Sequence, residues 1–96
     1  MISKRGLTQL LKGMAKEVVT ECANWYKAAR AARWESFDAV RADFPDADQT
    51  GSVLIFNIRH NRYRLIARVL YTKQKLYVKA LLTHKEYDRE EWKKWA

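Results

Sequence analysis

Histidine and arginine residues in the second half of the chain have side chains suited to acid–base chemistry and to phosphate binding. An imidazole can accept or donate a proton near neutral pH. A guanidinium group stays charged and can hold two phosphate oxygens at once. His84 lies two residues after Leu82, and Arg64 and Arg68 lie upstream of it. These residues are the first candidates for proton transfer and for binding an anionic group.

Three strand-like segments are expected to position these side chains. Residues 52–58, 63–71 and 76–82 are rich in valine, isoleucine, leucine, tyrosine and phenylalanine, which are typical of strands. Short polar connections at residues 59–62 and 72–75 separate them. Three such segments joined by short loops predict an antiparallel meander.

A helix is predicted after the last of these segments. The motif Thr-His-Lys-Glu at residues 83–86 has the spacing of a capping box, in which the threonine and glutamate side chains satisfy the first free amides of a helix. The helix is expected to run to about Lys94, with Trp92 and Trp95 available for packing. His84 would stand in its first turn, where the positive end of the helix dipole disfavours the imidazolium form.

The first half of the chain has the helical period. Apolar residues recur every three or four positions, at Leu7, Leu10, Leu11, Met14, Val18, Cys22 and Trp25. We predict a core-facing helix from about Leu7 to Ala29 and a shorter one from Trp34 or Glu35 to Asp43. The polar run at residues 46–51 then breaks the pattern. The expected fold is one α+β domain over residues 1–96: two N-terminal helices on a small antiparallel three-stranded sheet, and a short C-terminal helix.

Large aromatic residues are expected to build the core, because a chain of this size buries a modest share of its surface. The candidates are Trp25, Trp34, Phe37, Phe44 and Phe56. The single cysteine, Cys22, lies within the apolar helical stripe and is expected to pack there, and it cannot form an internal disulfide.

The distribution of charge is the most informative feature of the sequence. The formal net charge is +8, which attracts polyanions or acidic partners. Residues 51–82 contain no aspartate or glutamate, and they carry all of the following cations: Arg59, Arg62, Arg64, Arg68, Lys73, Lys75 and Lys79. Like charges on neighbouring strands repel, so this segregation indicates an anionic partner rather than a basic surface that only aids solubility.

Strand alternation sorts these cations onto one face of the sheet. In the middle strand, residues 62, 64, 66 and 68 share a face. In the last strand, residues 75, 77, 79 and 81 are expected to lie opposite the apolar residues 76, 78, 80 and 82. The predicted result is a patch of Arg64, Arg68, Lys79 and Tyr77 with His84 at its edge. Cations beside an aromatic ring suit a single-stranded nucleic acid.

Several segments resemble the HigB family, a branch of the RelE-like toxin superfamily. They are Trp34 to Asp48, Phe56-Asn57-Ile58, Asn61-Arg62-Tyr63-Arg64-Leu65-Ile66, Leu76-Tyr77-Val78-Lys79 and Thr83-His84-Lys85-Glu86-Tyr87-Asp88. The resemblance implies a RelE-like fold and an endonuclease that cuts translated mRNA at the ribosome. It also implies a helix-turn-helix antitoxin of the HigA type as partner. Arg59-His60 stands where glycines are expected in the family's hairpin.

Cleavage of RNA needs no metal if the 2′-hydroxyl attacks the neighbouring phosphate, and no cofactor is predicted. The enzyme must then move protons and stabilise the crowded phosphate. Arg64 is the first choice for the phosphate and His84 for acid or base. Arg68 and Lys79 are second choices, and Tyr87 either orients the substrate or packs in the core. The further residues expected to contact RNA are Arg59, Arg62, Lys75 and Tyr77.

Other readings of the same features remain open. A ParE-like relative would keep the fold and poison DNA gyrase by binding it, and a non-catalytic RNA-binding module would retain RNA without cutting it, since a fold alone does not determine function. His60 falls in the predicted hairpin tip and is expected to be incidental; with His84 it makes a poor metal site. No apolar run reaches transmembrane length and no signal-type segment follows the start, so the cytoplasm is expected.

Overall fold

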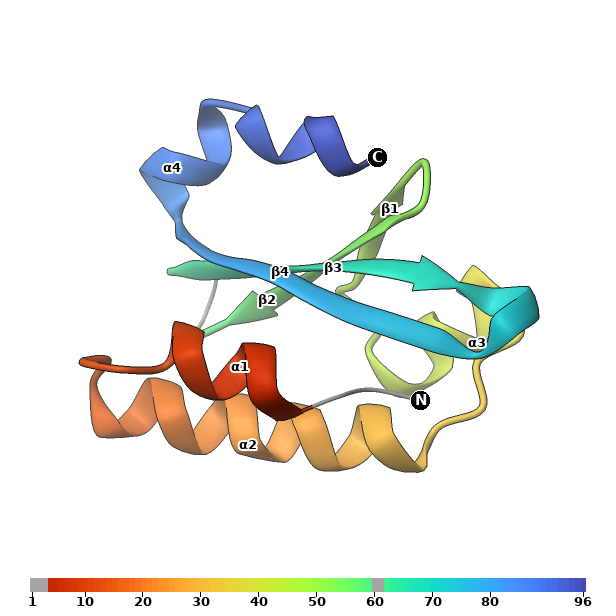
Figure 1. The fold of residues 1–96 in the computed structure, drawn as a ribbon, viewed down its shortest axis with the longest axis horizontal. Coiled ribbons are helices and arrows are strands. Elements are labelled where there is room, and N and C mark those ends of the chain that lie inside the picture. The colour runs from red at the N-terminus through yellow and green to blue at the C-terminus, as the bar shows by residue number, and fades with distance from the viewer. Residues whose placement is uncertain (1–3, 60–61) are drawn as a thin grey trace.

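A four-stranded antiparallel sheet forms the centre of the molecule, with helices on both of its faces (Figure 1). The computed structural model describes residues 4–59 and 62–96. The strands lie in the order β1-β2-β3-β4. The elements along the chain are α1 (Lys4–Leu10), α2 (Lys16–Ala31), α3 (Phe37–Asp43), β1 (Asp48–Thr50), β2 (Val53–Ile58), β3 (Tyr63–Leu70), η1 (Tyr71–Lys73), β4 (Lys75–Thr83), α4 (His84–Asp88) and η2 (Glu91–Trp95). The predicted α+β class is confirmed.

The prediction of one long first helix was wrong. The helical period continues through residues 7–25, but α1 ends at Leu10 and α2 begins at Lys16. Gly13 lies between them with a φ of 78°, a left-handed conformation that glycine adopts without steric cost. The chain therefore turns back, and α1 and α2 lie side by side on one side of the sheet (Figure 1).

The second predicted helix begins a little later than expected. The Ser36 hydroxyl accepts a hydrogen bond from the amide of Ala39, which caps the start of α3. Trp34 precedes the helix and packs in the core, and its indole N–H donates to a carboxylate oxygen of Asp43 at 2.8 Å. Residues 32–36, which include Trp34, are not helical.

The sheet has a fourth strand that was expected to be a loop. Asp48–Thr50 pairs with β2 as an edge strand, so the prediction of three strands was wrong. Its polar side chains find partners at the edge: the Gln49 amide donates to the carbonyl of Gly51 and its oxygen accepts from the Tyr71 hydroxyl. Gly51 makes the turn into β2 with a φ of 58°. A polar composition is compatible with an edge strand, because half of such a strand faces water.

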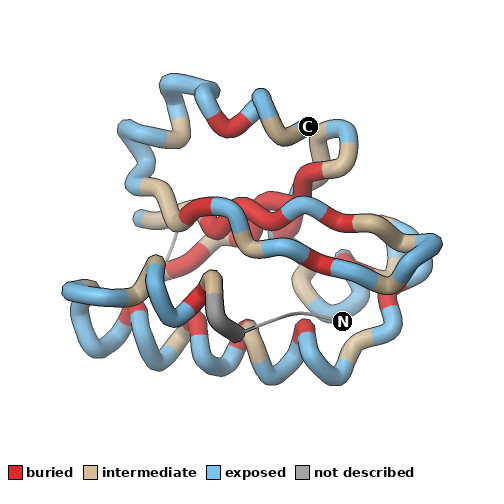
Figure 2. The backbone as a smooth tube through the Cα atoms, in the orientation of Figure 1, coloured by how far each residue is buried: buried red, intermediate tan, exposed pale blue. Residues whose placement is uncertain are grey.

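The face of the sheet under α2 carries an aromatic core. Phe56 lies at its centre, with ring centroids of Trp25, Trp34 and Phe44 at 5.1, 6.1 and 5.2 Å. Figure 2 shows buried residues along the central strands and at the turns of α2 that face them. The expected burial is confirmed for Trp25, Trp34 and Phe56, whereas Phe37 and Phe44 are partly buried. Cys22 is 0% exposed, and burial raises the pKa of its thiol to about 11.

The opposite face carries a second, smaller apolar cluster where open charge was expected. Its buried members are Val53, Ile55, Ile66, Ala80 and Trp92. The expected facing of residues 80–82 was wrong, because the register shifts between Ile66 and Ala67: Ile66 pairs with Ala80 but Ala67 pairs with Val78. A β-bulge of this kind reverses the alternation of the strand beyond it, so Ala80 and Leu82 face away from α2.

The C-terminal segment covers part of this second face. The predicted helix to Lys94 is interrupted: α4 ends at Asp88, Glu90 adopts a φ of 61°, and a 3₁₀ helix, η2, follows. Figure 1 shows α4 and η2 on the side of the sheet away from α1 and α2. Trp92, only 4% exposed, anchors the segment in the second cluster. None of the described helices is long and apolar enough to cross a membrane.

Candidate active site

Arg64 and Tyr87 meet at the end of the sheet where β4 passes into α4. Arg64 lies on β3 directly opposite Leu82, and it is half-buried. Its guanidinium carbon is 5.2 Å from the centre of the Tyr87 ring. A guanidinium over an aromatic ring is held by a cation–π interaction. This contact limits the side-chain freedom of Arg64 and keeps its charge at the surface of the sheet.

Tyr87 is in turn held by Trp92. The two rings stack with centroids 5.1 Å apart and an interplanar angle of 4°. The Trp92 indole N–H donates to the Tyr87 carbonyl at 3.0 Å. Burial, together with the nearby carboxylates of Asp48 and Asp88, raises the pKa of the Tyr87 hydroxyl, although Arg64 and Lys93 act in the opposite direction. The hydroxyl therefore stays protonated at neutral pH.

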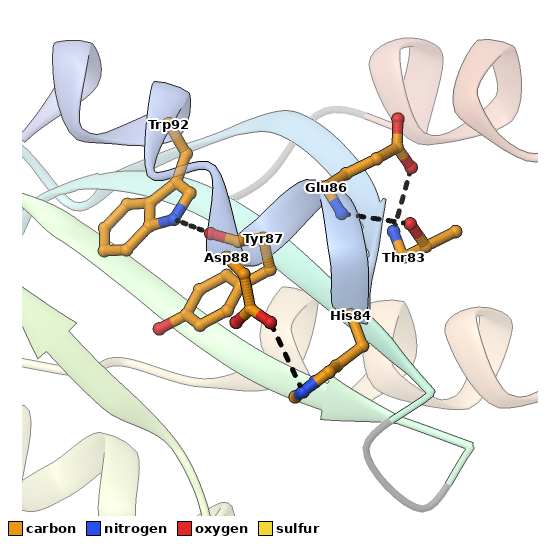
Figure 3. A network of polar contacts seen from close by, with 6 residues as sticks. All are labelled: Thr83, His84, Glu86, Tyr87, Asp88 and Trp92. Atoms are coloured by element: carbon orange, nitrogen blue, oxygen red, sulfur yellow. Dashed lines mark hydrogen bonds and ion pairs between the residues drawn. The ribbon is translucent and has the colours of Figure 1, made fainter.

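His84 and Asp88 lie one turn apart on α4, as Figure 3 shows. The imidazole Nε2 is 3.6 Å from a carboxylate oxygen of Asp88, and both side chains are exposed. Residues at positions i, i+3 and i+4 share a helix face, so His84, Tyr87 and Asp88 project together. The spacing of 84 and 88 on a predicted helix was the signal for the pair.

The predicted capping box fixes the start of α4. The Thr83 hydroxyl accepts from the Glu86 amide at 3.2 Å, and a Glu86 carboxylate oxygen accepts from the Thr83 amide at 3.0 Å (Figure 3). Hydrogen bonding from Thr83, first from its backbone amide and then from its side chain, lowers the pKa of the Glu86 carboxyl. Glu86 and Thr83 thus form the cap. The side chains of α4 that we consider as candidates for catalysis are therefore those of His84, Tyr87 and Asp88.

Two hydrogen bonds hold the β2–β3 hairpin, one to the start of α4 and one to α2. The amide of His84 donates to the Arg62 carbonyl at 3.2 Å, and the amide of Arg59 donates to a Glu21 carboxylate oxygen at 2.9 Å. Arg59 adopts a φ of 54°, so it takes the left-handed conformation for which the family's glycines were expected. The Arg59 side chain lines a surface hollow with residues of α2. His60 lies outside the described residues.

The predicted basic patch is divided into two parts. Arg68 lies directly opposite Tyr77 and, like Lys75 and Lys79, is exposed. Between Arg64 and Arg68 on β3 lies Ile66, which is buried in the cluster with Trp92. The structure therefore brings Arg64 to Tyr87, and it places Arg68, Tyr77, Lys75 and Lys79 beyond the apolar cluster.

One acidic side chain on this face was not anticipated. Asp48 on β1 pairs with Ile55 on β2, and it lies close enough to Tyr87 to raise the pKa of the Tyr87 hydroxyl. Asp48 was not predicted to lie here, because the polar run at residues 46–51 was expected to be a loop and not to form β1. Within residues 4–59 and 62–96, no group of three or more histidine, cysteine or carboxylate side chains is placed to hold a metal ion.

A comparison with known protein families identifies the family of this chain. Residues 19–90 match the HigB toxin family, described as the RelE-like toxic component of a toxin-antitoxin system. That segment is well over half of the chain and contains Arg64, His84 and Tyr87. The chain belongs to the HigB toxin family. Trp92 lies just beyond the matched segment.

Individual HigB proteins are also similar to this chain. The "mRNA interferase toxin HigB" of Escherichia coli K12 is 35% identical over 54 residues, which are 53% of this chain and 52% of the relative. The "mRNA interferase HigB" proteins of Escherichia coli O157:H7 and Shigella flexneri match to the same extent. The chain thus spans about half the length of the curated relatives it matches.

Proposed function

We propose that this HigB-family chain is an endoribonuclease that cuts mRNA and so inhibits translation. The observation that carries the proposal is the position of the Arg64 guanidinium against the Tyr87 ring, on the helix whose same face presents His84 and Asp88. These groups can hold a phosphate and move protons. The relatives named mRNA interferases support the same activity.

Arg64 binds the phosphate at which the chain is cut. Its charge does not depend on pH, and its two terminal N–H groups can donate to two phosphate oxygens. As the 2′-oxygen attacks, negative charge accumulates on those oxygens. A donor held in place before the reaction stabilises that charge without a cost of reorganisation. The contact with Tyr87 supplies this preorganisation.

His84 acts as the base and Tyr87 as the acid in this mechanism. The imidazole takes the proton of the 2′-hydroxyl, and the Asp88 carboxylate stabilises the imidazolium that results. The 2′-oxygen forms a bond to phosphorus while the bond from phosphorus to the 5′-oxygen breaks. The Tyr87 hydroxyl, kept protonated by its raised pKa, gives its proton to the leaving 5′-oxygen. The products are a 2′,3′-cyclic phosphate and a 5′-hydroxyl.

The cellular setting follows from the same proposal. We expect one RelE-like domain that acts in the cytoplasm on mRNA while the ribosome translates it. The partner is a HigA-type helix-turn-helix antitoxin. An acidic antitoxin segment would complement the net charge of +8.

The test is to map RNA ends in cells after brief induction. Wild-type protein should produce new 5′ ends within coding regions, and Arg64→Ala or His84→Ala should abolish most of them. Arg30→Ala is a matched control, because Arg30 is exposed on α2, on the other side of the sheet. Intact mRNA together with halted replication forks would contradict the proposal and favour the gyrase-directed alternative.

A further inference from the structure

An exposed tyrosine flanked by two cations lies on the same face as the candidate active site, but away from it. Tyr77 is 43% exposed, an unusual value for an aromatic side chain in this chain. Arg68 stands directly opposite it on β3, and the Lys79 ammonium nitrogen is 5.8 Å from the centre of its ring. Neither Arg68 nor Lys79 forms an ion pair with another described residue.

The bulge in β4 lets Ala80 face Trp92 while Lys79 stays beside Tyr77. Val78 pairs with Ala67 and Ala80 pairs with Ile66, so Lys79 is the extra residue between two regular pairs. In a regular strand, residues 77 and 79 would point the same way and residue 80 would not. The bulge keeps Lys79 next to Tyr77 and also turns Ala80 toward Trp92, since bulges redirect side chains.

This group is too far from Arg64 to share one phosphate with it. Arg64 and Arg68 are four residues apart on β3, which corresponds to about 13 Å at the usual rise of a strand. Ile66 lies between them and is buried with Ala80 and Trp92. That separation exceeds the reach of a single nucleotide, so the two groups must contact different nucleotides of one strand.

We propose that Tyr77, Arg68 and Lys79 form a second RNA-binding site, which stacks one base and holds the adjoining phosphate at a distance from the cut. The inference rests on the proposed function and adds a contact that determines how much flanking RNA the protein needs. Stacking on an aromatic side chain contributes about 1–3 kcal/mol per base and accepts any base. A purine, with the larger ring system, should be preferred at this position.

Binding of non-cleavable RNA analogues tests the proposal separately from cleavage. Oligonucleotides with 2′-deoxy sugars lack the attacking hydroxyl, and their binding can be followed by fluorescence anisotropy. Tyr77→Ala should weaken binding of an oligonucleotide of roughly eight nucleotides by about tenfold or more. It should leave binding of a dinucleotide unchanged. Tyr77→Phe should retain the affinity, because the ring remains.

Lysine variants provide the matched control. Lys79→Ala should weaken binding of the longer oligonucleotide, whereas Lys73→Ala, which removes an exposed lysine from η1, should have a smaller effect. Equal loss in both variants would overturn the proposal, because it would indicate general charge attraction alone. Unchanged affinity of Tyr77→Ala for the longer oligonucleotide would overturn it as well.

The outcome is distinguishable from failure of the nuclease proposal. If Tyr77 is required for binding while wild-type protein yields no RNA ends in cells, the second site stands and the nuclease assignment falls. If the ends appear but Tyr77→Ala binds longer RNA normally and loses affinity only for the antitoxin, the surface is a protein interface. That result would overturn the second RNA site and leave the nuclease intact.

Discussion

The two faces of the sheet differ in what covers them. One face is closed by α1 and α2 over a continuous core in which Phe56 contacts three other aromatic rings. In the described part of the chain, the other face contributes four buried residues to the second cluster, and its cover consists of two short helical segments anchored mainly by Trp92. Its remaining surface carries Arg64, Arg68 and Tyr77 beside that small cluster.

The difference indicates a division of tasks between the faces. A closed aromatic core contributes most of the buried apolar surface, and apolar burial dominates folding stability. The other face buries enough to hold Tyr87 and Arg64 in position and leaves the remainder open for a ligand. Variants of the first face should therefore change stability alone, and variants of the second should change RNA cleavage or binding.

Phe56→Ala should have the largest effect on stability. Removing a buried aromatic ring costs about 3–5 kcal/mol, and here it leaves Trp25, Trp34 and Phe44 without their shared neighbour. Urea unfolding measures the loss. If the alanine variant does not fold, Phe56→Leu should show a smaller loss with unchanged cleavage per folded molecule. Reduced cleavage by folded Phe56→Leu would contradict the claim that variants of the first face change stability alone.

Trp92→Ala should lower both stability and activity. It empties the second cluster, at a cost of about 3 kcal/mol or more, and removes the ring on which Tyr87 stacks. Trp92→Phe keeps a ring but loses the hydrogen bond to the Tyr87 carbonyl, worth about 1 kcal/mol. Trp95→Ala is the control, because Trp95 is only partly buried. Full cleavage by Trp92→Ala would show that Tyr87 needs no support.

Arg64→Ala should reduce the cleavage rate by about 100-fold with little change in unfolding. Arg64→Lys should recover only part of the rate, because an ammonium group cannot bind two oxygens in the same way. Arg68→Ala should instead raise KM for long RNA more than it lowers kcat. Equal losses of kcat for the Arg64→Ala and Arg68→Ala variants would indicate that the two arginines belong to one site.

The free energy of unfolding should fall as the pH rises above about 9, because the thiol of Cys22 is buried in the core beneath α2. The Cys22 pKa is raised from 9.0 to about 11 in the folded protein, so between these values the unfolded chain releases the thiol proton and the folded chain keeps it. This difference corresponds to a loss of about 2 kcal/mol by pH 11. Urea unfolding of wild type and Cys22→Ala across this range should show a shallower slope for the variant, since tyrosine ionisation affects both.

Thr83→Ala should have the smallest effect, a loss of about 1 kcal/mol from the missing cap. Because the cap lowers the pKa of Glu86, its contribution is present above the unfolded-state value and is lost as the pH falls through the folded-state value. The difference in unfolding free energy between wild type and Glu86→Ala should therefore shrink in acid. A difference that is constant from neutral to acidic pH would contradict the capping role of Glu86.

Local patterns in the sequence were sufficient for the strands, the capping box and the aromatic core. They failed where tertiary contacts decided the outcome. Asp48–Thr50 reads as a polar loop but pairs as an edge strand, and the bulge at Lys79 depends on register rather than composition. The cover formed by Trp92 could not be predicted either, because the chain reverses at Glu90 with a positive φ that its residue type does not favour.

The end chemistry of RNA cut in cells tests the central claim most directly. If Arg64 and His84 direct attack by the 2′-hydroxyl, the new fragments must carry a 5′-hydroxyl and a 2′,3′-cyclic phosphate, and adaptor ligation specific for each end type will detect them. Fragments with 5′-phosphates, produced equally by wild type and Arg64→Ala, would contradict the account.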